Sequence, residues 1–263
     1  MTLDDWGVLA RTPAGIALTL AIGIIYPLVG WFRFRRLETR PDPLPRGEKL
    51  GLYASIVISQ WALVGATALV LGAGGRSLAD VGQRAGFDVG RTFLVTIVLL
   101  LGFAVLSWFT TRSLAVAGAG DLPPHVRRAG RILPRDAIEV TGFVPVAITA
   151  GVCEEILYRG WLPWAFAGWA GSVLVGFLAA AAVFGLGHLY QGRNGVALTG
   201  LLGLALGATV AWTGSLVPGQ ALHVAVDIVN GIAVGAALAR IAQGDRLVQA
   251  PAASPPAEAS PEA

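Results

Sequence analysis

The stretch AIEVTGFVPVAITAGVCEEILYRGWLPWAFA, residues 137–167, is apolar over more than one membrane crossing needs. A helix needs roughly 20 apolar residues to cross a hydrocarbon core about 30 Å thick. The run therefore predicts a membrane helix that is tilted, kinked near Pro145 or partly interfacial. Its middle carries Glu154, Glu155 and Arg159. Charge at that depth is costly, so these side chains need a partner, water or a proton.

The whole chain has the composition of a membrane protein. Of its residues, 55% are hydrophobic and only 13% charged, and the mean hydropathy is +0.67. Such values lie far outside those of soluble domains. Seven apolar runs are long enough to cross a bilayer: 13–32, 52–73, 91–110, 137–167, 171–189, 195–213 and 216–240. The sequence predicts an all-α, multi-pass protein of the cell membrane with about seven transmembrane helices.

The pattern divides the chain into four regions. We expect a three-helix membrane region at 1–111, a basic cytoplasmic loop at 112–136, a second membrane region at 137–240 and a disordered tail at 241–263, which is rich in Ala, Pro, Ser and Glu.

The start, MTLDDWGVLAR, lacks the basic beginning of a removable signal, so the first run is expected to remain as a helix. Cys153 is the single cysteine, which excludes an internal disulfide.

Basic residues predict the orientation. Six lie in residues 33–49 and five between Arg112 and Arg135. With every run crossing once, these residues share a side with Arg193, Arg240 and Arg246. The positive-inside rule makes that side the cytoplasm, with the amino terminus outside and the carboxyl tail inside. Because the charges are spread over short loops at helix ends, they do not indicate nucleic-acid binding.

The two adjacent glutamates are predicted to differ. At about 100° per residue, Arg159 lies roughly 40° around the helix from Glu155 but about 140° from Glu154. Glu155 can therefore pair with Arg159, whereas Glu154 has no neutralising partner on its own helix. Helices one to three have no ionisable residue at their centres, only polar residues such as Ser59 and Gln60.

Two histidines lie in the late membrane helices. Phe184 and His188 are four residues apart, as are His223 and Asp227, so each pair shares a helical face. A single histidine in a membrane helix is as often a hydrogen-bonding contact between helices as a functional group. A Glu–Arg pair alone is likewise more often structural. Together, however, these residues supply a free carboxylate, two imidazoles and a second carboxylate.

Counting residues from the outer turns predicts which groups share a depth. Glu154 lies about sixteen residues before the turn near Gly168–Gly171, and His188 lies about eighteen after it. At 1.5 Å per residue the two lie at similar depth. His223 follows the next outer turn too closely to match. Either that turn dips into the membrane or the hairpin of helices four and five protrudes.

Three ordered motifs carry a family resemblance. They are E-E-x-x-x-R at 154–159, F-x-x-x-H at 184–188 and H-x-x-x-D at 223–227, with the flanking sequences EEILYRGWL, HLYQG and TGSLVPGQALHVAVDIVNG. This order across consecutive membrane helices resembles the CPBP family of intramembrane proteases, which includes CAAX prenyl endopeptidases and bacteriocin-immunity (Abi) proteins. The resemblance covers about 137–240, which we therefore expect to be the catalytic membrane domain.

The resemblance implies a role for each motif residue. Glu154 matches the general base that activates water, and His188 helps to hold that water. His223 and Asp227 match the pair that stabilises the oxyanion, and Glu155 with Arg159 supports them. Peptide hydrolysis needs this combination of an activated water and donors aimed at the developing charge.

Two mechanisms remain open, one without a metal and one with a bound zinc, and they differ in the role of Asp227. An ionised aspartate cannot donate a hydrogen bond, so Asp227 is either protonated, orients His223 or binds a metal. Glu154, His188 and His223 are the candidate ligands of a catalytic zinc, the one candidate cofactor. There is no H-E-x-x-H motif. We favour a metal-independent glutamate mechanism and keep zinc as the alternative.

The sequence thus predicts an intramembrane endopeptidase that acts between helices four, five and seven. Its expected partners are membrane lipids and a membrane-embedded or lipid-anchored peptide substrate, and no nucleic acid. One alternative is a non-catalytic immunity or scaffold protein that uses the same residues as polar contacts. The other is a small transporter, although no repeated halves with broken helices are visible.

Overall fold

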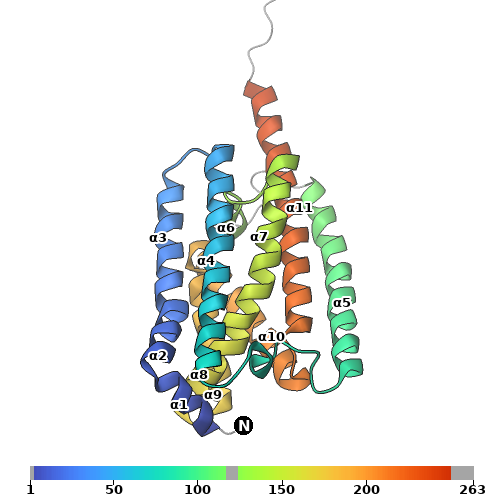
Figure 1. Ribbon diagram of the computed structural model, residues 1–263. Helices are drawn as coiled ribbons and strands as arrows, with labels where there is room; N and C mark the ends of the chain where they lie inside the picture. The colour runs from blue at the N-terminus through green and yellow to red at the C-terminus, as the bar shows by residue number, and fades with distance from the viewer. Residues whose placement is uncertain (1–2, 117–123, 250–263) are drawn as a thin grey trace, which may run out of the picture.

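The computed structural model describes residues 3–116 and 124–249, which form helices and turns without a β-strand (Figure 1). Six of the helical segments are long and apolar enough to cross a membrane: Pro13–Glu38, Arg46–Ala73, Val89–Ala115, Ala137–Ala170, Arg193–Thr213 and Val217–Gln243. The described ends lie at opposite ends of the bundle, with Leu3 at the bottom and α11 ending at the top of Figure 1. The expected all-α, multi-pass membrane fold is confirmed.

The first half contains one short helix and three long helical spans. α1 (Leu3–Arg11) is followed by one span made of α2 (Pro13–Leu20), the π-helical turn η1 (Ala21–Ile25) and α3 (Tyr26–Glu38). α4 (Arg46–Ala73) and α5 (Val89–Val116) follow, with the short helix η2 (Leu78–Val81) between them. The wide turn η1 precedes Pro27, whose ring cannot fit against a regular preceding turn.

The long apolar run at 137–167 forms one irregular span. α6 (Pro124–Ala129) precedes α7 (Ala137–Glu155), the π-helical turn η3 (Ile156–Trp161) and α8 (Leu162–Ala170). α7 continues as an α-helix through Pro145, so the irregularity lies instead in η3, directly before Pro163. A proline removes one helical hydrogen bond and crowds the carbonyl four residues earlier, here that of Arg159. The wide turn therefore starts immediately after the two adjacent glutamates.

The amino-terminal end of α7 is capped by a carboxylate. Asp136 accepts a hydrogen bond from the Glu139 backbone N–H at 2.9 Å and lies 2.7 Å from the Arg46 guanidinium. These two donors, the backbone N–H first, hold the pKa of Asp136 below its ordinary value. The cap fixes the start of α7 against the start of α4.

The run at 171–189, which we expected to cross the membrane, instead forms a helix that is too short to do so. α9 (Val173–Gly187) has 15 residues, or about 22 Å at 1.5 Å per residue, which is shorter than the bilayer core. It ends at His188 and leads through η4 (Leu189–Gln191) into α10 (Arg193–Thr213). Gly192, at φ +84°, makes this turn possible. α11 (Val217–Gln249) closes the bundle.

The amino-terminal helices pack against the helices that carry the motifs. α4 lies against α7, α5 lies against α11, and α1 lies against α8. α7 also packs along α11, where Gly151 allows close approach because a Cβ there would lie 2.7 Å from the Val224 backbone nitrogen. The region 1–111 is therefore part of the same bundle and lines its interior.

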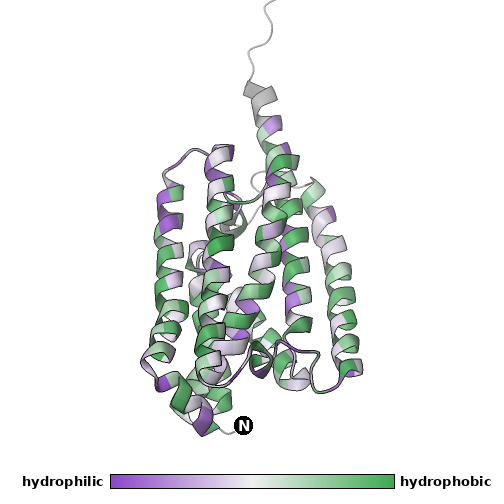
Figure 2. Ribbon diagram, viewed as in Figure 1, coloured by the Kyte–Doolittle hydropathy of each residue, from purple (hydrophilic) through white to green (hydrophobic). Residues whose placement is uncertain are grey.

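The outer surface of the bundle is apolar. Figure 2 shows hydrophobic residues along the length of α5 and hydrophilic ones at the upper ends of α3 and α4. Large apolar side chains point outward on α5, among them Leu94, Val98, Leu101 and Val105. Outward apolar faces on long helices are what a lipid environment requires.

The expected basic loop and the expected disordered tail both differ from the structure. α5 extends to Val116 and α6 begins at Pro124, so part of the expected basic loop 112–136 is helical, and residues 117–123 lie outside the described residues. α11 continues to Gln249 because adding a residue to a formed helix costs little. The first part of the expected tail 241–263 is thus helical, and 250–263 lie outside the described residues.

Candidate active site

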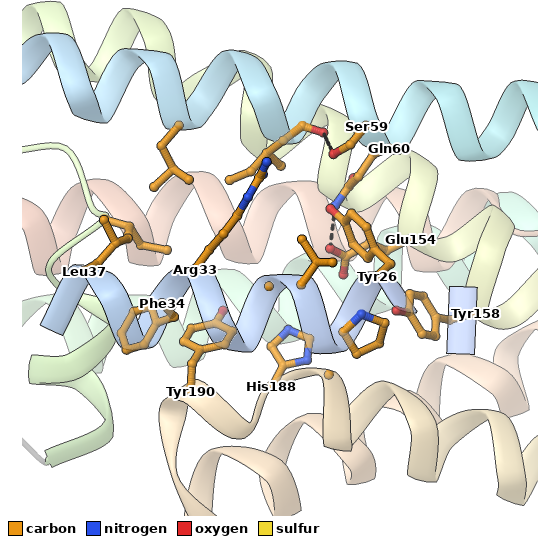
Figure 3. A pocket seen from close by; sticks show the side chains of 17 residues that line it. Tyr26, Arg33, Phe34, Leu37, Ser59, Gln60, Glu154, Tyr158, His188 and Tyr190 are labelled. Carbon is orange, nitrogen blue, oxygen red and sulfur yellow. Dashed lines mark hydrogen bonds between the residues drawn. The ribbon is translucent and has the colours of Figure 1, made fainter. Parts of the chain in front are cut away.

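The carboxylate of Glu154, near the end of α7, is held by a residue from α4. The side-chain nitrogen Nε2 of Gln60 donates a hydrogen bond of 2.9 Å to Glu154 Oε1. Figure 3 shows Gln60, Glu154 and Tyr26 facing one another from three different helices. Glu154 remains partly accessible, with 15% of its side chain exposed. As the helical geometry predicts, its partner is not on its own helix.

Glu155 and Arg159 form the ion pair that the spacing predicts. Arg159 Nη1 lies 3.0 Å from Glu155 Oε1, and both side chains are almost completely buried. The guanidinium also lies over the ring of Phe184, 3.9 Å from the ring centre. This cation–π contact adds to the stabilisation of a buried charge.

His223, on α11, is held by Glu155. Its Nδ1 lies 3.0 Å from Glu155 Oε1. A carboxylate only accepts, so this bond places a hydrogen on Nδ1. The other nitrogen, Nε2, lies 3.9 Å from Glu154 Oε2 and 3.7 Å from Asp227 Oδ2. Asp227 therefore does not hold His223 through Nδ1, because Glu155 already does.

His188 ends α9 and faces the same region. Its Nδ1 lies 2.9 Å from the Phe184 carbonyl oxygen, which accepts the hydrogen and leaves Nε2 for another partner. The imidazole packs edge-on against Phe184 and beside Tyr190. In Figure 3 it lies with Tyr190 across the cavity from Gln60 and Glu154.

Residue counting placed His223 at a different depth from Glu154, and the arrangement of the helices at the lower end of the bundle explains how the two meet. Figure 1 shows α8 and the start of α9, together with α1, below the turn between α10 and α11. The hairpin of helices four and five therefore extends further down the bundle than that turn, and His223 Nε2 lies 3.9 Å from Glu154 Oε2.

Two cavities meet at these residues. The larger, of about 390 Å³, is lined by Glu154, His188, His223 and Asp227, and also by residues of the segment 126–133. The smaller, of about 180 Å³, runs between α3 and α4. Glu154 and His188 line both, together with Ile56, Gln60, Ile132 and Tyr190. The shared wall therefore carries an acid and an imidazole that a ligand in either cavity can reach.

The structure adds residues that the motifs do not contain. Gln60 contacts Glu154 directly, and Tyr26, Tyr190 and Asn230 line the cavities. The sequence held one signal for Gln60, a polar residue in the centre of an apolar run. Such a residue in a membrane helix needs a hydrogen-bond partner, but its identity depends on how the helices pack.

The proposed zinc ligands do not fit a metal site as they are placed. Zinc needs ligand atoms that converge at about 2.0–2.2 Å from one point. Across residues 3–116 and 124–249, no three His, Cys, Asp or Glu side chains are arranged so that they could hold a metal ion. The arrangement instead offers a carboxylate that shares one cavity with two imidazoles.

Comparison with known proteins supports the resemblance. Residues 137–229 match the family of Rce1-like type II CAAX prenyl endopeptidases. Searches of curated proteins and of solved structures give no match. The matched segment starts with α7 and ends two residues after Asp227, so it contains all six candidate residues. Over residues 137–229, this match confirms the resemblance to the CPBP intramembrane proteases.

Proposed function

We propose that this protein is a CAAX-protease-like intramembrane endopeptidase in which Glu154 activates the hydrolytic water. The family match indicates a protease. The observation that carries the residue assignment is the environment of Glu154. It is a carboxylate with a neutral hydrogen-bond donor on one oxygen, an imidazole 3.9 Å from the other, and access to both cavities.

The proposed reaction begins with proton transfer. Glu154 takes a proton from a water that His188 helps to hold, and the oxygen of that water attacks the peptide carbonyl carbon. The carbonyl π electrons move to the oxygen, and His223 donates a hydrogen bond to the resulting oxyanion. Glu154 then passes the proton to the amine nitrogen as the C–N bond breaks. The oxyanion electrons re-form the carbonyl in the same step. The products are an amine and a carboxylic acid, which then loses its proton to water.

The surrounding charges support this role for His223. Glu155 holds Nδ1, so donation to an oxyanion comes from Nε2 and requires a proton on both ring nitrogens. The resulting imidazolium is balanced by Glu155, and Asp227 Oδ2 lies 3.7 Å from Nε2. Arg159 is in turn in ionic contact with Glu155, 3.0 Å from the same oxygen.

We further propose that the substrate is a membrane-embedded or lipid-anchored peptide that enters from the cytoplasmic half. Residues 126–133 lie in the basic segment assigned to the cytoplasm and supply Val126, Ala129, Ile132 and Leu133 to the larger cavity. In the smaller cavity, α3 and α4 supply mainly apolar side chains, including Val29, Phe34, Leu37 and Leu52. A peptide with one apolar and one polar end matches these two surroundings.

The test uses purified protein in liposomes and two quenched fluorescent peptides. Both end in a Cys-aliphatic-aliphatic-X sequence, and one carries a prenyl group on the cysteine. Wild type should cleave at least one of them, and Glu154→Gln should lower the rate about 10²–10⁴-fold, the usual contribution of a general base.

The matched control is Glu38→Gln, which changes an exposed carboxylate at the end of α3 and should leave the rate unchanged. No cleavage by wild type in liposomes of either orientation, or full activity of Glu154→Gln, would contradict the proposal. In that case, binding of a partner or transport of a solute would explain the polar residues instead.

A further inference from the structure

Gln60 lies outside the segment that matches the protease family, yet it makes the one direct hydrogen bond found from α4 to Glu154 among the described residues. We infer that Gln60 is a positioning residue that fixes which oxygen of Glu154 acts as the base. This inference rests on the proposed function. It also makes the amino-terminal helices part of the catalytic apparatus.

The contact is partly buried and lies at the junction of the two cavities. Only 2% of Gln60 is exposed, and it lines both cavities, as Glu154 does. The next residue, Trp61, donates a hydrogen bond of 3.2 Å to Thr149 Oγ1 on α7. This second bond fixes α4 on α7 close to the Gln60 contact, so the amide approaches Glu154 from a defined direction.

The two oxygens of Glu154 have different neighbours. Gln60 Nε2 donates to Oε1, while Oε2 lies 3.9 Å from His223 Nε2. A donor on one oxygen prevents the carboxylate from rotating about its last bond, and this leaves Oε2 as the atom that takes the proton. Without the amide, the carboxylate could turn so that either oxygen pairs with the imidazolium of His223.

A neutral amide suits this task better than a cation. A lysine or arginine here would hold the carboxylate more strongly, but its full positive charge would make the carboxylate a weaker base. Gln60 supplies direction with only a dipole. A mutation that removes the amide should therefore reduce turnover and leave substrate binding intact.

The first experiment compares Gln60→Met with Gln220→Met in the peptide assay. Methionine has nearly the same length and volume but no amide. Gln220 is the control because it is also a buried glutamine, whose side-chain amide donates to Gln83 and to the Val152 carbonyl rather than to Glu154. Gln60→Met should lower kcat about 10²-fold, as expected for a misplaced catalytic group, with KM changed less than twofold. Gln220→Met should keep the wild-type kcat.

The second experiment is a double-mutant cycle measured by thermal unfolding. It uses Gln60→Met, Glu154→Met and the double variant, and needs no substrate. The Tm shifts should be non-additive, because each single change removes the same hydrogen bond. Additive shifts would overturn the inference, and so would a wild-type kcat in Gln60→Met alongside an inactive Glu154→Gln. Failure of wild type to cleave either peptide would instead reject the proposed function. The double-mutant cycle would then still measure the coupling between Gln60 and Glu154, but without a catalytic role for either residue.

Discussion

The two ends of α7 each carry a buried acid–base pair, and they differ in how completely their polar atoms are satisfied. At the upper end in Figure 1, Lys49 Nζ lies 2.6 Å from Glu139 Oε2 and also donates to the Leu133 carbonyl at 3.1 Å. The same Glu139 oxygen accepts a hydrogen bond of 2.8 Å from the Arg135 backbone N–H. This pair has partners in several directions and lines neither of the two cavities.

At the lower end, the pair is incompletely satisfied. Both terminal nitrogens of Arg159 and Glu155 Oε2 are buried and make no hydrogen bond of regular geometry with the described residues, although Arg159 and Glu155 are in ionic contact. Glu154 and His223 beside them line a cavity. Buried polar groups are normally satisfied, so unused hydrogen-bonding capacity next to a cavity is consistent with the proposed active site at this end of the helix. The complete pair marks a structural contact.

The largest expected effect is a difference between the two adjacent glutamates, in which one substitution lowers stability and the other removes activity. Glu155→Gln leaves the buried Arg159 without its countercharge and should reduce the free energy of unfolding by about 3–5 kcal/mol. Glu154→Gln should remove activity while leaving thermal stability close to that of wild type, since an amide can still bond to Gln60. Thermal unfolding and peptide cleavage on equal amounts of folded protein measure both. If Glu155→Gln were the more damaging to turnover per folded molecule, the roles would be reversed.

Substitutions in the Lys49–Glu139 pair should change stability but not activity. Lys49→Met leaves Glu139 buried and uncompensated and should also destabilise by about 3–5 kcal/mol, but with unchanged kcat in the folded fraction. The double variant Lys49→Met/Glu139→Leu should recover most of the lost stability, because replacing a whole buried pair by apolar residues is often neutral. A fall in kcat in the double variant would show that the comparison between the two ends is wrong.

Asp227→Asn should have a smaller effect and distinguishes the two chemistries. Because Glu155 already holds His223 Nδ1, the charge of Asp227 is not needed for that task, and an asparagine amide adds a donor. We expect activity within about threefold of wild type, or higher, a change of well under 1 kcal/mol. Activity of both proteins should be unaffected by a chelator. Heavy loss in the Asn variant, with loss in chelator and bound zinc in wild type, would favour a metal mechanism.

The orientation prediction involves no change in activity. An exposed cysteine introduced at Thr39, directly after α3, should be labelled by an impermeant thiol reagent only after the cells are opened. A cysteine at Ala79, in η2 near the lower end, should be labelled in intact cells. Both positions are exposed, and the native Cys153 is buried. The reverse pattern would invert the membrane orientation and with it the cytoplasmic entrance.

Much of the fold could be predicted because hydrophobic length and helical periodicity are properties of the sequence. Apolar runs located the spans, and the four-residue spacing predicted the Glu155–Arg159 pair. The short α9 and the position of the irregular turn were not predictable in this way. Run length does not show where a helix ends, and the only kink expected from the sequence is near Pro145, whereas the irregular turn precedes Pro163.

The sequence by itself determined the class of protein, the six motif residues and the difference between Glu154 and Glu155. The membrane class follows from transfer free energy and the difference between Glu154 and Glu155 from angles within one helix, whereas the six motif residues follow from the resemblance to a known family. Only the tertiary structure decided that Gln60 holds Glu154 and that Glu155, not Asp227, holds His223 Nδ1. Contacts between helices depend on how deeply each helix sits and how closely the backbones approach, as at Gly151 and Val224. Neither quantity is encoded in the periodicity of any single segment.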